Sequence, residues 1–355
     1  MTPGFRGRGS PINPQNRFEA VRIVADPDID PGYAEPGEEA PSPRTVFLKD
    51  LTETILSRNQ SPDLGFGYSM NAYRGCEHGC AYCYARPTHE YLGLSAGIDF
   101  ETRIFVKEQA PRLLRQELSK ASWKPQVVMM SGVTDCYQPA ERRFRLTRAC
   151  LEVFAEFRNP VGIVTKNFLV TRDLDVLSRM AADGVVSVML SVTSLDPELS
   201  RRLEPRASSP ARRLEAVRLL NEAGIPAYVN VAPVIPGLND HEIPRIVQAA
   251  AEAGAWDAGM SLVRFPYGVR EVFLEWLHAH YPEKANGVIS RIREYRDGEL
   301  SDPRWNTRHT GEGPHAEALA ELFRVSCLRA GLPRRTSALS TDRFRRPGGT
   351  QLELL

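Results

Sequence analysis

Residues 71–87 read Asn-Ala-Tyr-Arg-Gly-Cys-Glu-His-Gly-Cys-Ala-Tyr-Cys-Tyr-Ala-Arg-Pro and contain three of the six cysteines of this 355-residue chain. These cysteines, Cys76, Cys80 and Cys83, follow the spacing C-x3-C-x2-C. Gly75 and Gly79 lie beside the sulfurs and allow the backbone to turn tightly around a small group. A four-iron cluster usually takes four cysteines, so three would leave one iron without a protein ligand. The stretch therefore predicts an inorganic centre with one reactive position.

Two other interpretations of the three cysteines stay open. A structural zinc site would take a fourth ligand from His78 or His89, although such sites usually pair two C-x2-C turns and the chain has no second pair. The cysteines could also be core thiols, but their close spacing between glycines is poor core patterning. A disulfide framework is not expected in a chain of this length with few cysteines and no signal-peptide pattern.

The cysteine spacing, with Tyr82 just before the last cysteine, resembles the signature of the radical S-adenosylmethionine (radical SAM) superfamily. The whole cysteine stretch, followed by Thr-Asp-Cys-Tyr-Gln-Pro at 134–139, is similar to the spore photoproduct lyase-like branch. The resemblance implies that Cys76, Cys80 and Cys83 hold a [4Fe-4S] cluster whose open iron binds S-adenosylmethionine (SAM). It implies that one electron then cleaves SAM to a 5′-deoxyadenosyl radical, with a flavodoxin or ferredoxin as electron donor.

The composition is that of a globular protein without a strong overall charge. Hydrophobic residues make up 42% of the chain, which is enough for a substantial core. The net charge of +1 gives no global attraction for nucleic acid. The sequence has no apolar run long enough for a membrane-spanning helix, so no membrane partner is expected. We expect a cytoplasmic location, because exposed thiolates and clusters are easily oxidised.

From about residue 64 the chain alternates between strand-like and helix-like segments, which predicts an α/β fold with a parallel sheet. The pattern does not distinguish an open sheet from a barrel, whereas the resemblance implies a partial (β/α)6 TIM-like barrel. The expected strands are residues 65–73, 126–131, 161–165, 185–191, 227–232 and 258–263. The expected helices are residues 109–119, 145–157, 172–182, 211–223 and 240–253, with two more after residue 265, the second at 285–295.

The composition also changes along the chain, which suggests four regions. Residues 1–62 are rich in proline, glycine and charge and are expected to form an extended or partly disordered N-terminal arm. Residues 63–268 form the predicted barrel, and residues 269–332 a helical C-terminal region. Residues 333–355, rich in arginine, are expected to form a flexible tail.

Active residues of a parallel barrel lie at the C-terminal ends of its strands. The loop after the second predicted strand contains Gly132, Thr134, Asp135 and Glu141. The resemblance implies that backbone groups near Gly132 and the carboxylate of Asp135 or Glu141 bind the ammonium group of SAM. It also places Tyr82 among the cofactor-binding residues. A polar turn, in which Asp135 binds its own backbone, is the structural alternative.

Later strand ends provide the remaining cofactor candidates. Lys166 follows the third predicted strand and could pair with the SAM carboxylate, or extend to solvent. Ser191 and Thr193 end the fourth and suit a ribose, or cap a turn. Arg206 could bind a carboxylate with two parallel hydrogen bonds, or form a surface ion pair. The turn after the fifth strand, at Val234, resembles the adenine-contacting turn of the superfamily.

Cys136 lies in the loop after the second predicted strand and is the candidate catalytic residue besides the cluster. Spore photoproduct lyases return a hydrogen atom from a cysteine near this strand, which suggests a similar role. We therefore expect a radical SAM enzyme that abstracts hydrogen from an unidentified substrate, for which nucleic acid is one candidate. A DNA photoproduct lyase is the first alternative. A zinc-stabilised nucleic-acid-binding module is the alternative from another class.

Overall fold

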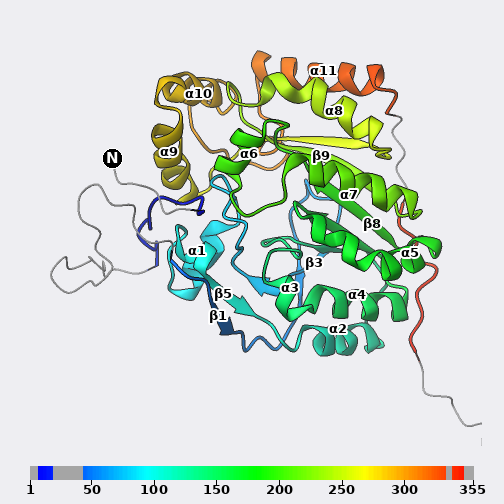
Figure 1. Ribbon diagram of the computed structural model, residues 1–355. Coiled ribbons are helices and arrows are strands. Elements are labelled where there is room, and N and C mark those ends of the chain that lie inside the picture. Colours follow the sequence, from blue (N-terminus) through cyan, green and yellow to red (C-terminus); the bar gives the residue numbers. More distant parts are fainter. Residues whose placement is uncertain (1–6, 19–42, 333–337, 348–355) are drawn as a thin grey trace, which may run out of the picture.

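A computed structural model describes residues 7–18, 43–332 and 338–347 (Figure 1). Its centre is a seven-stranded sheet in the order β10-β9-β8-β7-β6-β3-β2, parallel throughout except that β2 runs antiparallel to β3. This confirms the predicted α/β class with a parallel sheet. The strands are β2 (Leu56–Arg58), β3 (Tyr68–Met70), β6 (Val128–Met130), β7 (Val161–Thr165), β8 (Val186–Ser191), β9 (Ala227–Val234) and β10 (Ala258–Leu262).

Helices between successive parallel strands cover the outer face of the sheet (Figure 1). In α4, for example, the buried residues Cys150, Leu151, Phe154 and Phe157 recur at helical spacing and face the core. The covering helices are α2 (Ala110–Ser119), α4 (Leu146–Phe157), α5 (Leu174–Ala182), α7 (Pro210–Glu222) and α8 (Ile243–Glu252). Short elements adjoin them: α3 (Glu141–Phe144), η2 (Phe168–Asp173), α6 (Pro197–Leu203) and η3 (Asp240–Glu242).

The first predicted strand, residues 65–73, is divided between two sheets. Its first part is β3, whereas β4 (Tyr73–Arg74) pairs antiparallel with β5 (Arg103–Val106) in a second sheet of order β1-β5-β4. The third strand of that sheet is β1 (Val46–Lys49). The cysteine stretch begins directly after β4, so both sheets fix the backbone that leads into it.

Residues 7–18 pack against the cysteine stretch and the short elements that follow it, η1 (Arg86–Leu92) and α1 (Asp99–Thr102). Glu101 is fully buried and accepts hydrogen bonds from the backbone amides of Gly9 (3.0 Å) and Ser10 (2.8 Å). Its carboxylate also pairs with the buried Arg86. Residues 1–6 and 19–42 of the predicted arm lie outside the described residues, and the arm as a domain stays a prediction.

The C-terminal part adds α9 (Val269–His280), α10 (Pro282–Glu294) and α11 (Pro314–Arg329). Figure 1 shows α11 beside α8, across the end of the sheet that carries β10. Residues 338–347 pass the C-terminal ends of α5 and α4, where the Ser340 amide donates to the Gly184 carbonyl (2.9 Å) and the Arg345 amide donates to the Phe157 carbonyl (2.9 Å). The rest of the predicted tail lies outside the described residues, and the domain boundaries stay predictions. None of the helices in the described ranges is long and apolar enough to cross a membrane.

Candidate active site

The three cysteines lie on one loop at the C-terminal edge of the parallel sheet. Cys76 and Cys80 are buried, Cys83 is partly buried, and none forms a disulfide. Gly75 and Gly79 have φ values of +83° and +66°, which a residue with a side chain rarely adopts. The loop is anchored from outside, because Arg86 donates to the Cys80 carbonyl from Nε (3.0 Å) and Nη2 (2.8 Å).

The electrostatics of the thiols fit a group that brings positive charge. Burial raises the pKa of Cys83 to about 11 and that of Cys80 well above its usual value. Both would therefore stay neutral thiols in the protein alone. A bound metal centre deprotonates its thiol ligands outright. This donor set, three free sulfurs on a tightly turned loop, is compatible with an iron–sulfur cluster.

The two histidines considered as zinc ligands face other groups. His78 Nδ1 lies 3.3 Å from Asp135 Oδ2, and His78 Nε2 lies 3.0 Å from Asn167 Nδ2. His89 Nε2 lies 2.9 Å from the Arg103 carbonyl oxygen. In the described part of the chain, no three His, Cys, Asp or Glu side chains are grouped so as to hold a single metal ion.

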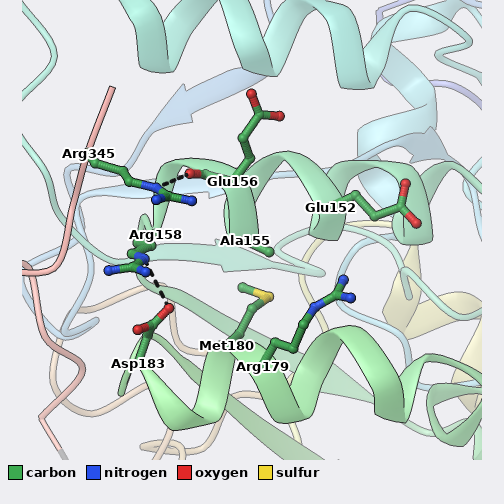
Figure 2. A pocket seen from close by; sticks show the side chains of 8 residues that line it. All are labelled: Glu152, Ala155, Glu156, Arg158, Arg179, Met180, Asp183 and Arg345. Carbon is green, nitrogen blue, oxygen red and sulfur yellow. Dashed lines mark hydrogen bonds and ion pairs between the residues drawn. The ribbon is translucent and has the colours of Figure 1, made fainter. Parts of the chain in front are cut away.

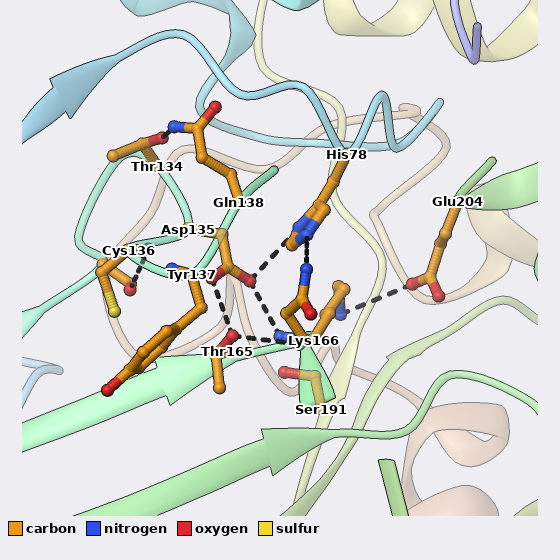
Figure 3. Close-up of polar contacts among 12 residues, drawn as sticks. His78, Thr134, Asp135, Cys136, Tyr137, Gln138, Thr165, Lys166, Ser191 and Glu204 are labelled. Carbon is orange, nitrogen blue, oxygen red and sulfur yellow. Dashed lines mark hydrogen bonds and ion pairs between the residues drawn. The ribbon is translucent and has the colours of Figure 1, made fainter. Parts of the chain in front are cut away.

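Asp135, in the loop after β6, connects the cysteine loop to two strand ends (Figure 3). Its Oδ1 accepts from Thr165 Oγ1 (2.7 Å), and its Oδ2 accepts from the Lys166 backbone amide (2.8 Å) while facing His78. Burial alone would raise the pKa of Asp135, but the His78 ring and the two donors hold it below its usual value. Asp135 is therefore a carboxylate that fixes the relative positions of β6, β7 and the cysteine loop.

Glu204, just after α6, is the centre of a second buried network. Tyr82, Thr193 and Arg213 all donate to its carboxylate, and Lys166 Nζ lies 3.5 Å from Oε1. Burial opposes ionisation of Glu204, but Arg213 and Lys166 lower its pKa to about 2. Figure 3 shows Lys166 and Glu204 on the side of the site opposite Cys136. The network brings together the sequence candidates Tyr82, Thr193 and Lys166.

The other candidates of the β6 loop face different surroundings. Gly132 accepts a hydrogen bond from Tyr84 Oη (2.9 Å), and Thr134 Oγ1 donates to the Gly75 carbonyl (2.6 Å), so this loop directly contacts the cysteine loop. Glu141 is fully buried, and both its oxygens accept from protein donors. Those donors are the Tyr73 hydroxyl, Arg172 and the amides of residues 147 and 148. A role of Glu141 in cofactor binding stays a prediction.

Cys136 is buried in the main hydrophobic core, with its backbone amide bonded to Ser131 Oγ (3.0 Å). Arg206 Nη1 lies 3.0 Å from Glu77 Oε1, inside the cysteine stretch. Ser191 and Val234 are buried at the ends of β8 and β9. The contacts described for these residues are with other parts of the protein. Their predicted roles towards the cofactor and substrate therefore stay predictions.

Sequence reasoning missed the partners that hold the candidates in place. These partners are His78, which faces Asp135, and the residues Asn167, Glu204 and Arg213. Asn167 directly follows Lys166, and Glu204 lies two residues before Arg206, so their positions at strand and helix ends were visible. Arg213 lies in α7 and gave no signal, because an arginine on a helix usually faces solvent. Its burial, at 1% exposure, follows from the carboxylate of Glu204.

The sequence of this chain is similar to a known protein family and to several uncharacterised proteins. Residues 70–250 match the family model of the radical SAM superfamily. An uncharacterised protein of Mycobacterium tuberculosis is 38% identical over 262 residues, which are 73% of this chain and 76% of the relative. One from Methanocaldococcus jannaschii is 33% identical over 178 residues, 50% of this chain and 64% of its own.

Among solved structures, spore photoproduct lyase complexed with a dinucleoside spore photoproduct has a similar fold. The TM-score is 0.56 at 17% identity, over 80% of this chain and 79% of that one. At this identity the likeness concerns the fold alone. It agrees with the arrangement of parallel strands and outer helices described above.

Proposed function

This chain belongs to the radical SAM superfamily, and from that premise we propose that it is an iron–sulfur enzyme that cleaves SAM reductively and abstracts hydrogen from a substrate. The observation that carries the proposal is the loop of Cys76, Cys80 and Cys83, three free sulfurs at the C-terminal edge of a parallel sheet. Catalytic groups of parallel barrels gather at this edge. We further propose a flavodoxin or ferredoxin as electron donor and a reducing compartment such as the cytoplasm.

Cys76, Cys80 and Cys83 would hold the cluster. When bound, a [4Fe-4S] cluster with an open iron supplies the electron that splits SAM into methionine and a 5′-deoxyadenosyl radical. The loop after β6 borders this position, since Gly132 and Thr134 both bond to the cysteine stretch. Its backbone would position the methionine part of SAM.

We propose that the two buried networks keep the site rigid. Asp135 ties β6, β7 and the cysteine loop together, and Glu204 ties Tyr82 to Thr193 at the end of β8. Neither carboxylate is free in the protein. Their contribution would be to hold hydroxyls, amides and the Lys166 ammonium at fixed positions around the cofactor, which is how active sites limit reorganisation.

Cys136 supports a second candidate, a lyase that repairs a DNA photoproduct. Burial raises the pKa of Cys136 well above its usual value, so the sulfur keeps the hydrogen atom that such a reaction must return to a substrate radical. A structural neighbour was solved with a dinucleoside spore photoproduct. An oligonucleotide containing that photoproduct tests this candidate: repair by the wild type that is lost in Cys136→Ala would support it.

The proposed function is tested by SAM cleavage without substrate. We expect anaerobically reconstituted protein, reduced with dithionite, to release 5′-deoxyadenosine slowly, measured by chromatography. Protein kept oxidised is the matched control and should release none. No 5′-deoxyadenosine from protein with full iron and sulfide, across several reductants, would refute the proposal. A colourless protein that retains zinc instead of iron would favour the binding-module alternative.

A further inference from the structure

The parallel sheet has an open edge at β10, and residues 302–312 close it. The Leu262 amide of β10 donates to the His309 carbonyl (2.9 Å). On the other side, Arg308 forms two hydrogen bonds with Asp63 (2.6 and 2.7 Å), in the loop before β3. Residues 302–312, the closing segment, therefore bridge the two ends of the curved sheet next to the cysteine loop.

Arg264 lies at this junction, two residues beyond the end of β10. Its guanidinium carbon is 4.5 Å from the centre of the Tyr84 ring. Tyr84 directly follows Cys83 in sequence, is 45% exposed, and bonds through its hydroxyl to the Gly132 carbonyl. Arg264 thus contacts the cysteine loop through Tyr84, which itself bonds to the β6 loop, and the charge of Arg308 in the closing segment acts on it.

The charge around Arg264 is not balanced by the described residues. Asp63 alone would raise the pKa of Arg264, but it is already bound by Arg308, and no carboxylate in the described ranges forms an ion pair with Arg264. Arg296 adds a fully buried guanidinium that donates to the backbone carbonyls of residues 263, 307 and 308. The Asp302 carboxylate also acts on Arg296, but it is already paired with Arg304. Among the described residues, the Nε of Arg296 has no hydrogen-bond partner.

The histidine of this cluster does not offset the excess positive charge either. Burial and the neighbouring Arg264 and Arg308 lower the pKa of His309 to about 4, so it is neutral near pH 7. Burial, together with Arg308 and Arg296, also lowers the pKa of Arg264. A half-buried cation kept among other cations is an unfavourable arrangement unless an anion joins it.

Building on the proposed radical SAM function, we propose that Arg264 binds an oxyanion of the substrate, a phosphate or carboxylate group, beside Tyr84 at the mouth of the barrel. The planar guanidinium can give two parallel hydrogen bonds to either group. An anionic handle held there would orient the rest of the substrate next to the cysteine loop. The proposed substrate therefore carries an acidic group. This group would be bound by the local charge at Arg264, because the net charge of the chain, +1, gives no general attraction for anions.

The test measures anion binding by the anaerobically reconstituted protein without SAM, using inorganic phosphate in one arm and acetate in the other. We expect Arg264→Gln to weaken binding of the preferred anion roughly tenfold or more, because a charged hydrogen-bond partner is lost. The affinity of Arg264→Lys should lie between those of the wild type and Arg264→Gln, since lysine keeps the charge but cannot form two parallel hydrogen bonds. Arg179→Gln is the control, because Arg179 is an exposed arginine of the α4–α5 surface without a carboxylate partner in the described residues. The arm that responds identifies the oxyanion as phosphate or carboxylate.

Equal affinities in wild type, Arg264→Gln and Arg179→Gln would overturn the inference. So would an Arg264→Gln protein that binds SAM more weakly but both anions normally, because Arg264 would then serve the cofactor. Iron content and circular dichroism of each variant show that it is folded. Anion binding by a wild type that releases no 5′-deoxyadenosine would reject the proposed function and keep Arg264 as an anion site. Cleavage without anion binding would reject the Arg264 site alone.

Discussion

The two ends of the barrel differ in how deeply their ion pairs are buried. At the C-terminal edge, Glu204 and Arg213 form an ion pair with side-chain exposures of 0% and 1%. At the other end, a groove of about 350 Å³ lies between α4 and α5 and is also lined by Arg345. Figure 2 shows its lining residues. There Arg158 and Asp183 pair at 3.1 Å with exposures of 34% and 29%.

This contrast indicates where positioning matters. A buried ion pair contributes little net stability compared with apolar packing, because both charges lose their hydration. Removing one partner is costly, since it leaves a buried charge alone. Exposed pairs of the kind in the groove contribute about 0–1 kcal/mol. We infer that the buried charges at the C-terminal edge hold the side chains of the site in fixed positions. The charges of the groove are ordinary surface charges.

The largest difference between the two regions should appear at the cysteine loop. We expect Cys80→Ala to lose its iron and sulfide after anaerobic reconstitution, because two remaining cysteines are too few to hold a cubane. Cys150→Ala is the matched control: Cys150 is buried in α4, away from the loop, and that variant should load like the wild type. Full iron loading of Cys80→Ala would contradict the assignment.

The next largest effect concerns the buried network. Glu204→Gln keeps the size of the side chain but leaves Arg213 and Lys166 without their carboxylate. We expect the free energy of unfolding to fall by about 3–5 kcal/mol, measured by urea titration of the two proteins under identical anaerobic conditions. A loss below about 1 kcal/mol would place this pair with the surface pairs and remove the contrast.

The fold could be predicted where the signal is local in sequence and not where it depends on contacts between distant residues. The strand at residues 161–165 was predicted with the bounds of β7, because a continuous apolar run is a strong local signal. Helix α11 lies in the region predicted to be helical, residues 269–332, but it was not predicted as a separate helix, because its buried residues, Ala316, Leu319 and Ser326, form a weak apolar stripe. The packing of residues 7–18 was not predicted either, because their contacts are mainly through backbone groups, which leave no hydrophobic pattern.

The site shows the same limit. The cysteine spacing could be recognised because all three residues are close in sequence. Tyr82 and Glu204 are 122 residues apart, and only the folded chain brings them together. Asp135 was predicted as a ligand of the cofactor, and sequence alone could not indicate that Thr165 and His78 would occupy its oxygens. The partners of a buried charge depend on tertiary structure.

A moderate effect is expected where residues 7–18 cover the cysteine loop. A Cβ atom on Gly9 would lie 1.5 Å from the Gly79 carbonyl oxygen, so Gly9→Ala must displace this segment. Overpacking of this kind typically costs about 1–3 kcal/mol. We expect the cluster of Gly9→Ala to bleach faster in air, followed by absorbance near ~400 nm. Gly65→Ala, where nothing lies within 4 Å of the added atom, is the control. Equal bleaching rates would show that the segment does not protect the loop.

The smallest effect should come from the groove. Asp183→Asn removes the carboxylate that pairs with Arg158, but water can solvate both side chains because each is about one-third exposed. We expect the free energy of unfolding to change by less than about 1 kcal/mol in the urea titration used for Glu204→Gln. Added salt should reduce the difference further, since exposed pairs are screened. A loss close to that of Glu204→Gln, or one insensitive to salt, would mean that the groove has a structural role similar to the buried network. The distinction between the two ends of the barrel would then fail.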